Sequence, residues 1–195
     1  MDYTILINRE HPLDPNYIPE DLVITDENEN NFHRFKNPNL KPMIDRVVYE
    51  HFLQMSKAAA DEGMEIMINS GYRSYEYQQE ILIYNIERQG IENALRSVAL
   101  PGTSEHQSGL AFDICYIIDG ERSDYIGEDQ KETKWLFENA HKFGFILRYP
   151  EGKEEITGYR YEPWHYRYVG KELAEKLYKQ NLTLEEYYLE YSLKK

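Results

Sequence analysis

The first candidate for chemistry is a carboxylate inside an apolar run. Asp113 stands in the middle of Leu110–Ile118, where a lone carboxylate is costly unless it is paired or binds a metal ion. His106 lies seven residues earlier, and Gly109 between them lets the backbone pass close to another group. Taken alone, these residues fit a paired aspartate with a surface histidine as well as they fit a metal site.

A second segment favours the metal site. Glu162–Tyr168 (EPWHYRY) holds a carboxylate and an imidazole three residues apart among large side chains. With His106, Asp113 and His165 as ligands, Zn²⁺ keeps its fourth tetrahedral position open for water, as catalytic zinc sites do. Glu162 is then free to act as the general base toward that water. These residues predict metal-assisted hydrolysis with one zinc ion per chain.

Three further side chains flank these candidates. Arg73 follows a Gly-Tyr turn at the end of an expected strand, and its guanidinium could hold a carboxylate or stabilise an oxyanion, although a surface arginine fits equally well. Trp164 could form a pocket wall or pack behind His165. Glu105, beside His106, is interpreted as a structural residue or one that supports a ligand.

Composition limits the alternatives. The 195 residues fit one catalytic domain, with an irregular, proline-interrupted segment over residues 1–40 packed against it. The only cysteine, Cys115, excludes an intramolecular disulfide and a cysteine-rich zinc site, so a metal must be held by histidines and carboxylates. The net charge of 22 − 35 = −13 argues against partners such as nucleic acid or anionic lipid.

The chain offers no sign of membrane insertion or export. We find no stretch of about 18 apolar residues. The first eight residues, MDYTILIN, lack the basic region and long apolar core of a signal peptide. We therefore expect a cytoplasmic protein as encoded, or an extracytoplasmic one if an N-terminal anchor has been removed.

The elements that must position these residues alternate without a regular βαβ rhythm, which predicts an α+β fold. The run Thr25–Asn31 and the segment Asp119–Gln130 are expected to be polar loops. Thr183 and Glu186 form a capping box for the last helix. Apolar periodicity and caps predict helices over Lys41–Glu62, Ser74–Arg88 and Lys131–Phe143, and strands over Met64–Asn69, Leu110–Ile118, Phe145–Arg148 and Trp164–Val169.

Three segments carry a resemblance to a known family: Ser70–Gln78 (SGYRSYEYQ), Pro101–Asp113 (PGTSEHQSGLAFD) and Glu162–Gly170 (EPWHYRYVG). They resemble the zinc D-alanyl-D-alanine carboxypeptidases, which include VanY- and VanXY-type peptidases and L,D-carboxypeptidases. The stretches Ile7–Leu13 and Phe143–Gly158 also resemble this family. This family belongs to the superfamily of the lysostaphin-type peptidases and the Hedgehog signalling domain. The signature S-x-H-x-x-G-x-A-x-D is complete here, from Ser104 to Asp113.

The resemblance implies a small central antiparallel sheet flanked by helices, with a zinc ion held by His106, Asp113 and His165. It implies that Glu162 is the catalytic base and that Arg73 binds the carbonyl to be cleaved. It also implies substrate-binding roles for Gln78 and Ser104, which join Trp164 as candidate pocket residues.

The function implied is removal of the C-terminal D-Ala from peptidoglycan precursor peptides, in glycopeptide resistance or in wall recycling. The substrate could instead be free D-Ala-D-Ala, a tetrapeptide stem cut by an L,D-carboxypeptidase, or an L-Ala–D-Glu bond cut by an endopeptidase. The Hedgehog precedent adds an alternative without catalysis, a binding module stabilised by zinc. The intact Glu162, Arg73 and ligand set argue against that last alternative.

Overall fold

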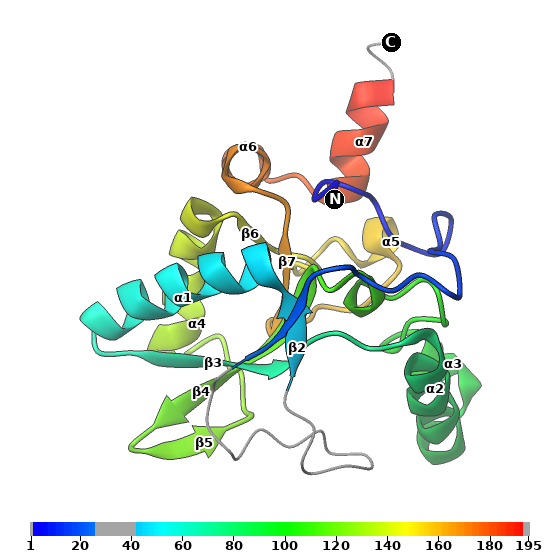
Figure 1. Ribbon diagram of the computed structural model, residues 1–195, viewed down its shortest axis with the longest axis horizontal. Helices are drawn as coiled ribbons and strands as arrows, with labels where there is room; N and C mark the ends of the chain where they lie inside the picture. The colour runs from blue at the N-terminus through cyan, green and yellow to red at the C-terminus, as the bar shows by residue number, and fades with distance from the viewer. Residues whose placement is uncertain (1, 26–41, 193–195) are drawn as a thin grey trace.

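The computed structural model describes residues 2–25 and 42–192 and contains a central antiparallel sheet with helices on both sides (Figure 1). The expected α+β class is confirmed. The strands are β1 (Leu22–Ile24), β2 (Met43–Asp45), β3 (Glu65–Ser70), β4 (Ala111–Ile118), β5 (Glu121–Ser123), β6 (Phe145–Leu147) and β7 (His165–Tyr168). The helices are α1 (Arg46–Asp61), α2 (Tyr75–Gln89), α3 (Ile91–Leu95), α4 (Lys131–Asn139), α5 (Glu154–Thr157), α6 (Lys171–Gln180) and α7 (Leu184–Ser192), with 3₁₀ turns η1 (Glu105–Ser108) and η2 (Ala140–Phe143).

The main sheet has the order β3-β4-β7-β6, with β5 paired to β4, while β1 and β2 form a separate antiparallel pair. Side chains alternate between the two faces of each strand. Phe112 on β4 and Tyr166 on β7 therefore share one face, where they pack with Phe52 of α1 and Leu136 of α4 in the hydrophobic core. The neighbouring positions, which include Asp113, His165 and Arg167, point to the opposite face.

Local capping signals account for several helix boundaries. The Ser74 hydroxyl accepts the backbone N–H of Tyr77 at 3.1 Å and starts α2. At α7, the backbone N–H of Thr183 donates to a Glu186 carboxylate oxygen at 2.7 Å, and the backbone N–H of Glu186 donates to the Thr183 hydroxyl at 3.2 Å. The predicted capping box is confirmed.

Two differences from the prediction concern the segments before α1 and after β4. The helix expected from Lys41 begins at Arg46, because the Asp45 side chain accepts the N–H groups of Val47 and Val48 and the preceding residues form β2. The loop expected over 119–130 contains β5, which pairs with β4 through a tight Asp119-Gly120 turn. Both turn residues have positive φ, 53° and 79°, as an Asp-Gly hairpin turn requires.

The N-terminal expectation falls partly outside the described residues. Residues 26–41, which include most of the run Thr25–Asn31, are not described. Residues 2–25 are irregular apart from β1 and pack onto the sheet through backbone carbonyls. The carbonyls of Tyr3 and Ile5, for example, accept hydrogen bonds from Arg167 at 3.0 and 2.8 Å. The assignment of the whole chain to a single catalytic domain stays a prediction.

Phe112 is the centre of the aromatic core, and its removal is expected to destabilise the protein strongly. Its fully buried ring lies 5.3 Å from both Phe52 and Phe145 between ring centroids. Phe112→Ala should lower the free energy of unfolding by about 3–5 kcal/mol, measured by urea denaturation. Tyr125→Ala, at a side chain that is 66% exposed, should cost less than about 0.5 kcal/mol. Equal losses in the two variants would contradict this picture of the core.

Candidate active site

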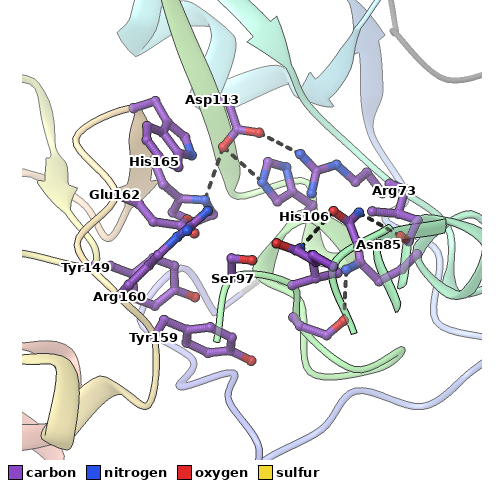
Figure 2. A pocket seen from close by; sticks show the side chains of 16 residues that line it. Arg73, Asn85, Ser97, His106, Asp113, Tyr149, Tyr159, Arg160, Glu162 and His165 are labelled. Atoms are coloured by element: carbon purple, nitrogen blue, oxygen red, sulfur yellow. Dashed lines mark hydrogen bonds and ion pairs between the residues drawn. The ribbon is translucent and has the colours of Figure 1, made fainter. Parts of the chain in front are cut away.

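Sheet register brings two of the predicted ligands together. Asp113 on β4 pairs directly with His165 on β7, so both side chains lie on the face opposite the helix-covered core. His106 comes from η1, just before β4. Figure 2 shows Asp113 between the two imidazoles, and its Oδ1 lies 3.3 Å from Nε2 of His106 and 3.2 Å from Nδ1 of His165. Two ligands at about 2.0–2.2 Å from a tetrahedral zinc ion are about 3.3–3.6 Å apart, so this set fits Zn²⁺.

The two histidines turn opposite nitrogens toward this point. His106 presents Nε2, and its Nδ1 lies 2.7 Å from the backbone carbonyl oxygen of Gly71, to which a protonated Nδ1 donates. His165 presents Nδ1, and its Nε2 lies 3.3 Å from a Glu105 carboxylate oxygen. Each ring therefore has an acceptor for the proton on its outer nitrogen, which leaves the inner lone pair available to a metal ion.

Arg73 contacts the opposite side of the aspartate. Its guanidinium donates to Asp113 Oδ2 at 2.5 Å and to the Ser70 hydroxyl at 3.0 Å. Asp113 Oδ2 is thus held by Arg73, and Oδ1 is left to face the histidines. Burial opposes ionisation of Asp113, but His106 and Arg73 outweigh it and hold the pKa of this carboxyl well below its usual range. The aspartate is therefore an anion, as a metal ligand must be.

Glu162 lies beside His165 at the start of β7, where the backbone N–H of His165 donates to the Glu162 carbonyl at 3.1 Å. Its side chain is buried and lines the same cavity as the three candidate ligands (Figure 2). Burial, with a contribution from the Asp113 carboxylate, raises the pKa of Glu162 to about 7. A carboxyl with a pKa near neutrality can take up and release a proton within one reaction cycle.

These groups open onto a cavity of about 280 Å³. One wall is a single stripe of α2, and the facing wall is built by Tyr149, Tyr159 and Arg160 (Figure 2). Gln78 and Trp164 line the cavity, whereas Ser104 lies buried at the start of η1, two residues before His106. The stripe on α2 consists of Gln78, Ile81, Asn85 and Gln89.

Sequence patterns assigned no role to the individual residues of the facing wall or to the charges behind it. Tyr149 packs against the ring of His165 with centroids 4.9 Å apart. It lies in Phe143–Gly158, a stretch that resembles the same family, but no signal in that stretch singles out the tyrosine. Arg148 and Arg167 are almost fully buried and both donate to Glu105. One local signal for these charges is Arg167, which stands among aromatic residues in β7. An arginine in such a strand indicates a buried charge, and a buried charge requires a partner of opposite charge.

Comparison with known proteins finds relatives of this chain among D-alanyl-D-alanine carboxypeptidases. A family model described as VanY, D-alanyl-D-alanine carboxypeptidase, matches residues 41–171. YodJ of Bacillus subtilis is 42% identical over 183 residues, which cover 94% of this chain and 66% of YodJ. The D-alanyl-D-alanine carboxypeptidase of Enterococcus faecalis is 40% identical, with 94% of this chain and 64% of that protein covered. The chain thus spans slightly less than two thirds of the length of these two relatives.

A shorter relative matches along nearly its whole length. The bifunctional D-Ala-D-Ala dipeptidase and D-Ala-D-Ala carboxypeptidase VanXYC of Enterococcus gallinarum is 37% identical over 191 residues, which cover 94% of this chain and 92% of VanXYC.

Solved structures agree with this grouping. The LdcB LD-carboxypeptidase has a TM-score of 0.80 and 41% identity, with 94% of this chain and 84% of that chain covered. VanYB in complex with D-alanine-D-alanine has a TM-score of 0.79 and 40% identity, with 95% and 96% covered. A variant of the D,D-pentapeptidase VanY in complex with Zn(II) has a TM-score of 0.78 and 38% identity, with 96% and 99% covered.

Proposed function

Because the chain belongs to the VanY family of D-alanyl-D-alanine carboxypeptidases, we propose that it is a zinc-dependent D,D-carboxypeptidase that removes the C-terminal D-Ala from peptidoglycan precursor peptides. The observation that carries this proposal is the convergence of His106, Asp113 and His165 beside the buried Glu162 and Arg73. The VanYB complex with D-alanine-D-alanine supports the substrate class.

Zinc is the metal that this donor set suits best. Two imidazole nitrogens and one carboxylate oxygen form a three-ligand set with an open fourth position, and the VanY relative was solved with Zn(II). When bound, the ion supplies positive charge that polarises a carbonyl and lowers the pKa of a water molecule.

The chain's own residues account for the proton transfers. Glu162 accepts a proton from the attacking water, whose oxygen forms the new bond to the carbonyl carbon of the last peptide bond. Arg73 donates hydrogen bonds to the carbonyl oxygen as negative charge develops on it. Glu162 then delivers the proton to the leaving nitrogen, the C–N bond breaks, and D-alanine departs with its amine.

The shape of the cavity favours a peptide stem over a free dipeptide. The lining stripe on α2 runs from Gln78 to Gln89, a length of about 16 Å at 1.5 Å per residue. A free D-Ala-D-Ala dipeptide would occupy only part of this length, whereas a longer peptide stem could contact all of it. Carboxamide side chains at Asn85 and Gln89 can hydrogen-bond the backbone of residues that precede the scissile bond.

Mass spectrometry of products tests the proposal directly. The zinc-loaded protein would be incubated separately with a pentapeptide stem, a tetrapeptide stem and D-Ala-D-Ala. Loss of one alanine from the pentapeptide alone is the expected result. Cleavage of the tetrapeptide alone would replace the proposal with an L,D-carboxypeptidase, and cleavage of the dipeptide alone with a dipeptidase. Zinc binding without any cleavage would indicate a binding module.

Activity is expected to fall on the acid side of neutrality. Glu162 must be ionised to accept a proton, and burial raises its pKa to about 7. Protonation of Glu162 should therefore lower kcat/KM about tenfold for each pH unit below the pKa. A nearby zinc ion favours the ionised form of Glu162. The midpoint of the acidic limb of the pH–rate profile should therefore lie at or below pH 7. A pH–rate profile between pH 4 and 9 at fixed ionic strength checks this, and a flat profile down to pH 4 would contradict it.

A further inference from the structure

We propose that Glu105 is a positioning residue that holds His165 in its metal-binding orientation, and that a buried chain of ion pairs through Arg148 connects this position to Glu185 on the C-terminal helix α7. The inference rests on the proposed zinc site and adds to it a requirement for residues that do not touch the metal ion.

Glu105 is aimed at the outer nitrogen of His165. One carboxylate oxygen, Oε2, lies 3.3 Å from His165 Nε2, while Nδ1 of the same ring lies 3.2 Å from Asp113 Oδ1. The imidazole is therefore held at both nitrogens. A proton on Nε2 is stabilised by the Glu105 carboxylate, which leaves the Nδ1 lone pair directed at the metal position.

The second oxygen of Glu105 is fixed by two arginines. Oε1 accepts from Nε of Arg148 at 2.7 Å and from Nη1 of Arg167 at 2.8 Å. All three side chains are essentially buried, at 0–1% exposed. Charge-assisted hydrogen bonds of this kind, shielded from water, leave the carboxylate little freedom to rotate. The position of Oε2, and through it the position of His165, is consequently set by this network.

The network continues to Glu185, near the start of α7. Arg148 donates from Nη1 and Nη2 to the two oxygens of Glu185, at 2.8 and 2.6 Å. The helix that carries Glu185 is itself held against the N-terminal segment, because the Tyr188 hydroxyl donates to the Thr4 carbonyl at 2.7 Å. Figure 1 shows α7 beside the start of the chain. The four charges, two glutamates and two guanidinium groups, balance one another inside the protein.

The other histidine ligand does not depend on these charges. His106 is held by the backbone carbonyl oxygen of Gly71 at 2.7 Å, and no side-chain substitution removes that acceptor. The two histidines should therefore respond differently to loss of the network. This asymmetry separates a positioning role from a general loss of structure, which would affect both rings.

Glu105→Gln tests the role of the carboxylate with little change in shape. We expect zinc affinity, measured by competition with a chromophoric chelator, to fall about 10- to 100-fold. Nitrogen-15 NMR of the zinc-loaded variant should show a changed tautomer or ring environment for His165 with that of His106 preserved. The matched control is Glu132→Gln, at a glutamate that is 4% exposed and lies on α4, across the sheet from the ligands. Its zinc affinity should equal that of the unaltered protein.

Glu185→Gln probes the far end of the network and provides a second test if Glu105→Gln does not fold. It should weaken zinc binding in the same direction, by about threefold or more, because Arg148 loses an anionic partner and no longer fixes Glu105 as firmly. Unchanged affinity in this variant would overturn the link to α7.

Two outcomes separate the inference from the proposed function. If the unaltered protein binds zinc and cleaves substrate while folded Glu105→Gln matches it in affinity and NMR spectrum, only the positioning role is overturned. If the unaltered protein binds no zinc, the proposed function fails and the inference fails with it.

Discussion

Glu162→Gln is expected to lower kcat by about 10²- to 10⁴-fold while the protein keeps its full zinc content. Glutamine keeps the size of the side chain and its hydrogen-bonding atoms, but its amide cannot accept a proton from water near neutral pH. None of the three expected zinc ligands is altered, and the side chain is buried at 7% exposed, so the cavity wall stays in place.

The measurements are steady-state kinetics on the pentapeptide stem together with metal analysis of the same preparation. Because Glu162 acts on the reacting water and not on substrate binding, the loss should appear in kcat with little change in KM. Glu92→Gln, at an exposed position on α3, is the matched control and should keep normal kinetics. Turnover by Glu162→Gln at the rate of the unaltered protein would exclude Glu162 as the base.

His165→Ala is expected to lose zinc and activity together. The imidazole is expected to supply one of three donor atoms, and its Nδ1 lies 3.2 Å from Oδ1 of Asp113, another expected ligand. Removing it leaves two protein ligands. We expect zinc affinity to drop by more than about 100-fold, beyond the loss typical of residues that only support a ligand.

Zinc content after dialysis against a weak chelator measures this loss, with His11→Ala as the control. His11 is exposed, its ring contacts Asn8, and it is not among the residues that line the cavity. The control should keep one zinc ion per chain, as should the unaltered protein. Full zinc occupancy in His165→Ala would refute the ligand role and would leave the convergence of the three side chains unexplained.

The polypeptide between residues 42 and 192 contains no helix long and apolar enough to cross a membrane, and the same is true of residues 2–25. This agrees with the lack of a long apolar run in the sequence.

Local signals were sufficient for most of the secondary structure. The Ser74 cap, the capping box of Thr183 and Glu186 and the glycine after η2 each act within a few residues, so their effect can be read from adjacent positions. The same kind of signal is present at Asp45, which caps α1, and at the Asp119-Gly120 turn. At both positions the start of the element depends on adjacent residues and not on tertiary contacts.

Residue types and short spacings are sufficient to establish which chemical groups form the candidate site. One cysteine left histidine and carboxylate as the metal donors, an aspartate inside an apolar strand required a partner, and Glu162 stood three residues before His165. These conclusions depend on residue type and short spacing, which folding does not change.

The folded structure is needed to establish which atoms of those residues face one another. It turns Nε2 of His106 and Nδ1 of His165 toward Oδ1 of Asp113, and it gives the two oxygens of Asp113 different partners. It also brought Glu105 to Arg148 and Arg148 to Glu185, pairs separated by 43 and 37 residues. Such contacts depend on strand register and on which elements pack against each other. Hydrogen bonds act over about 3 Å, whereas spacing along the chain constrains only near neighbours.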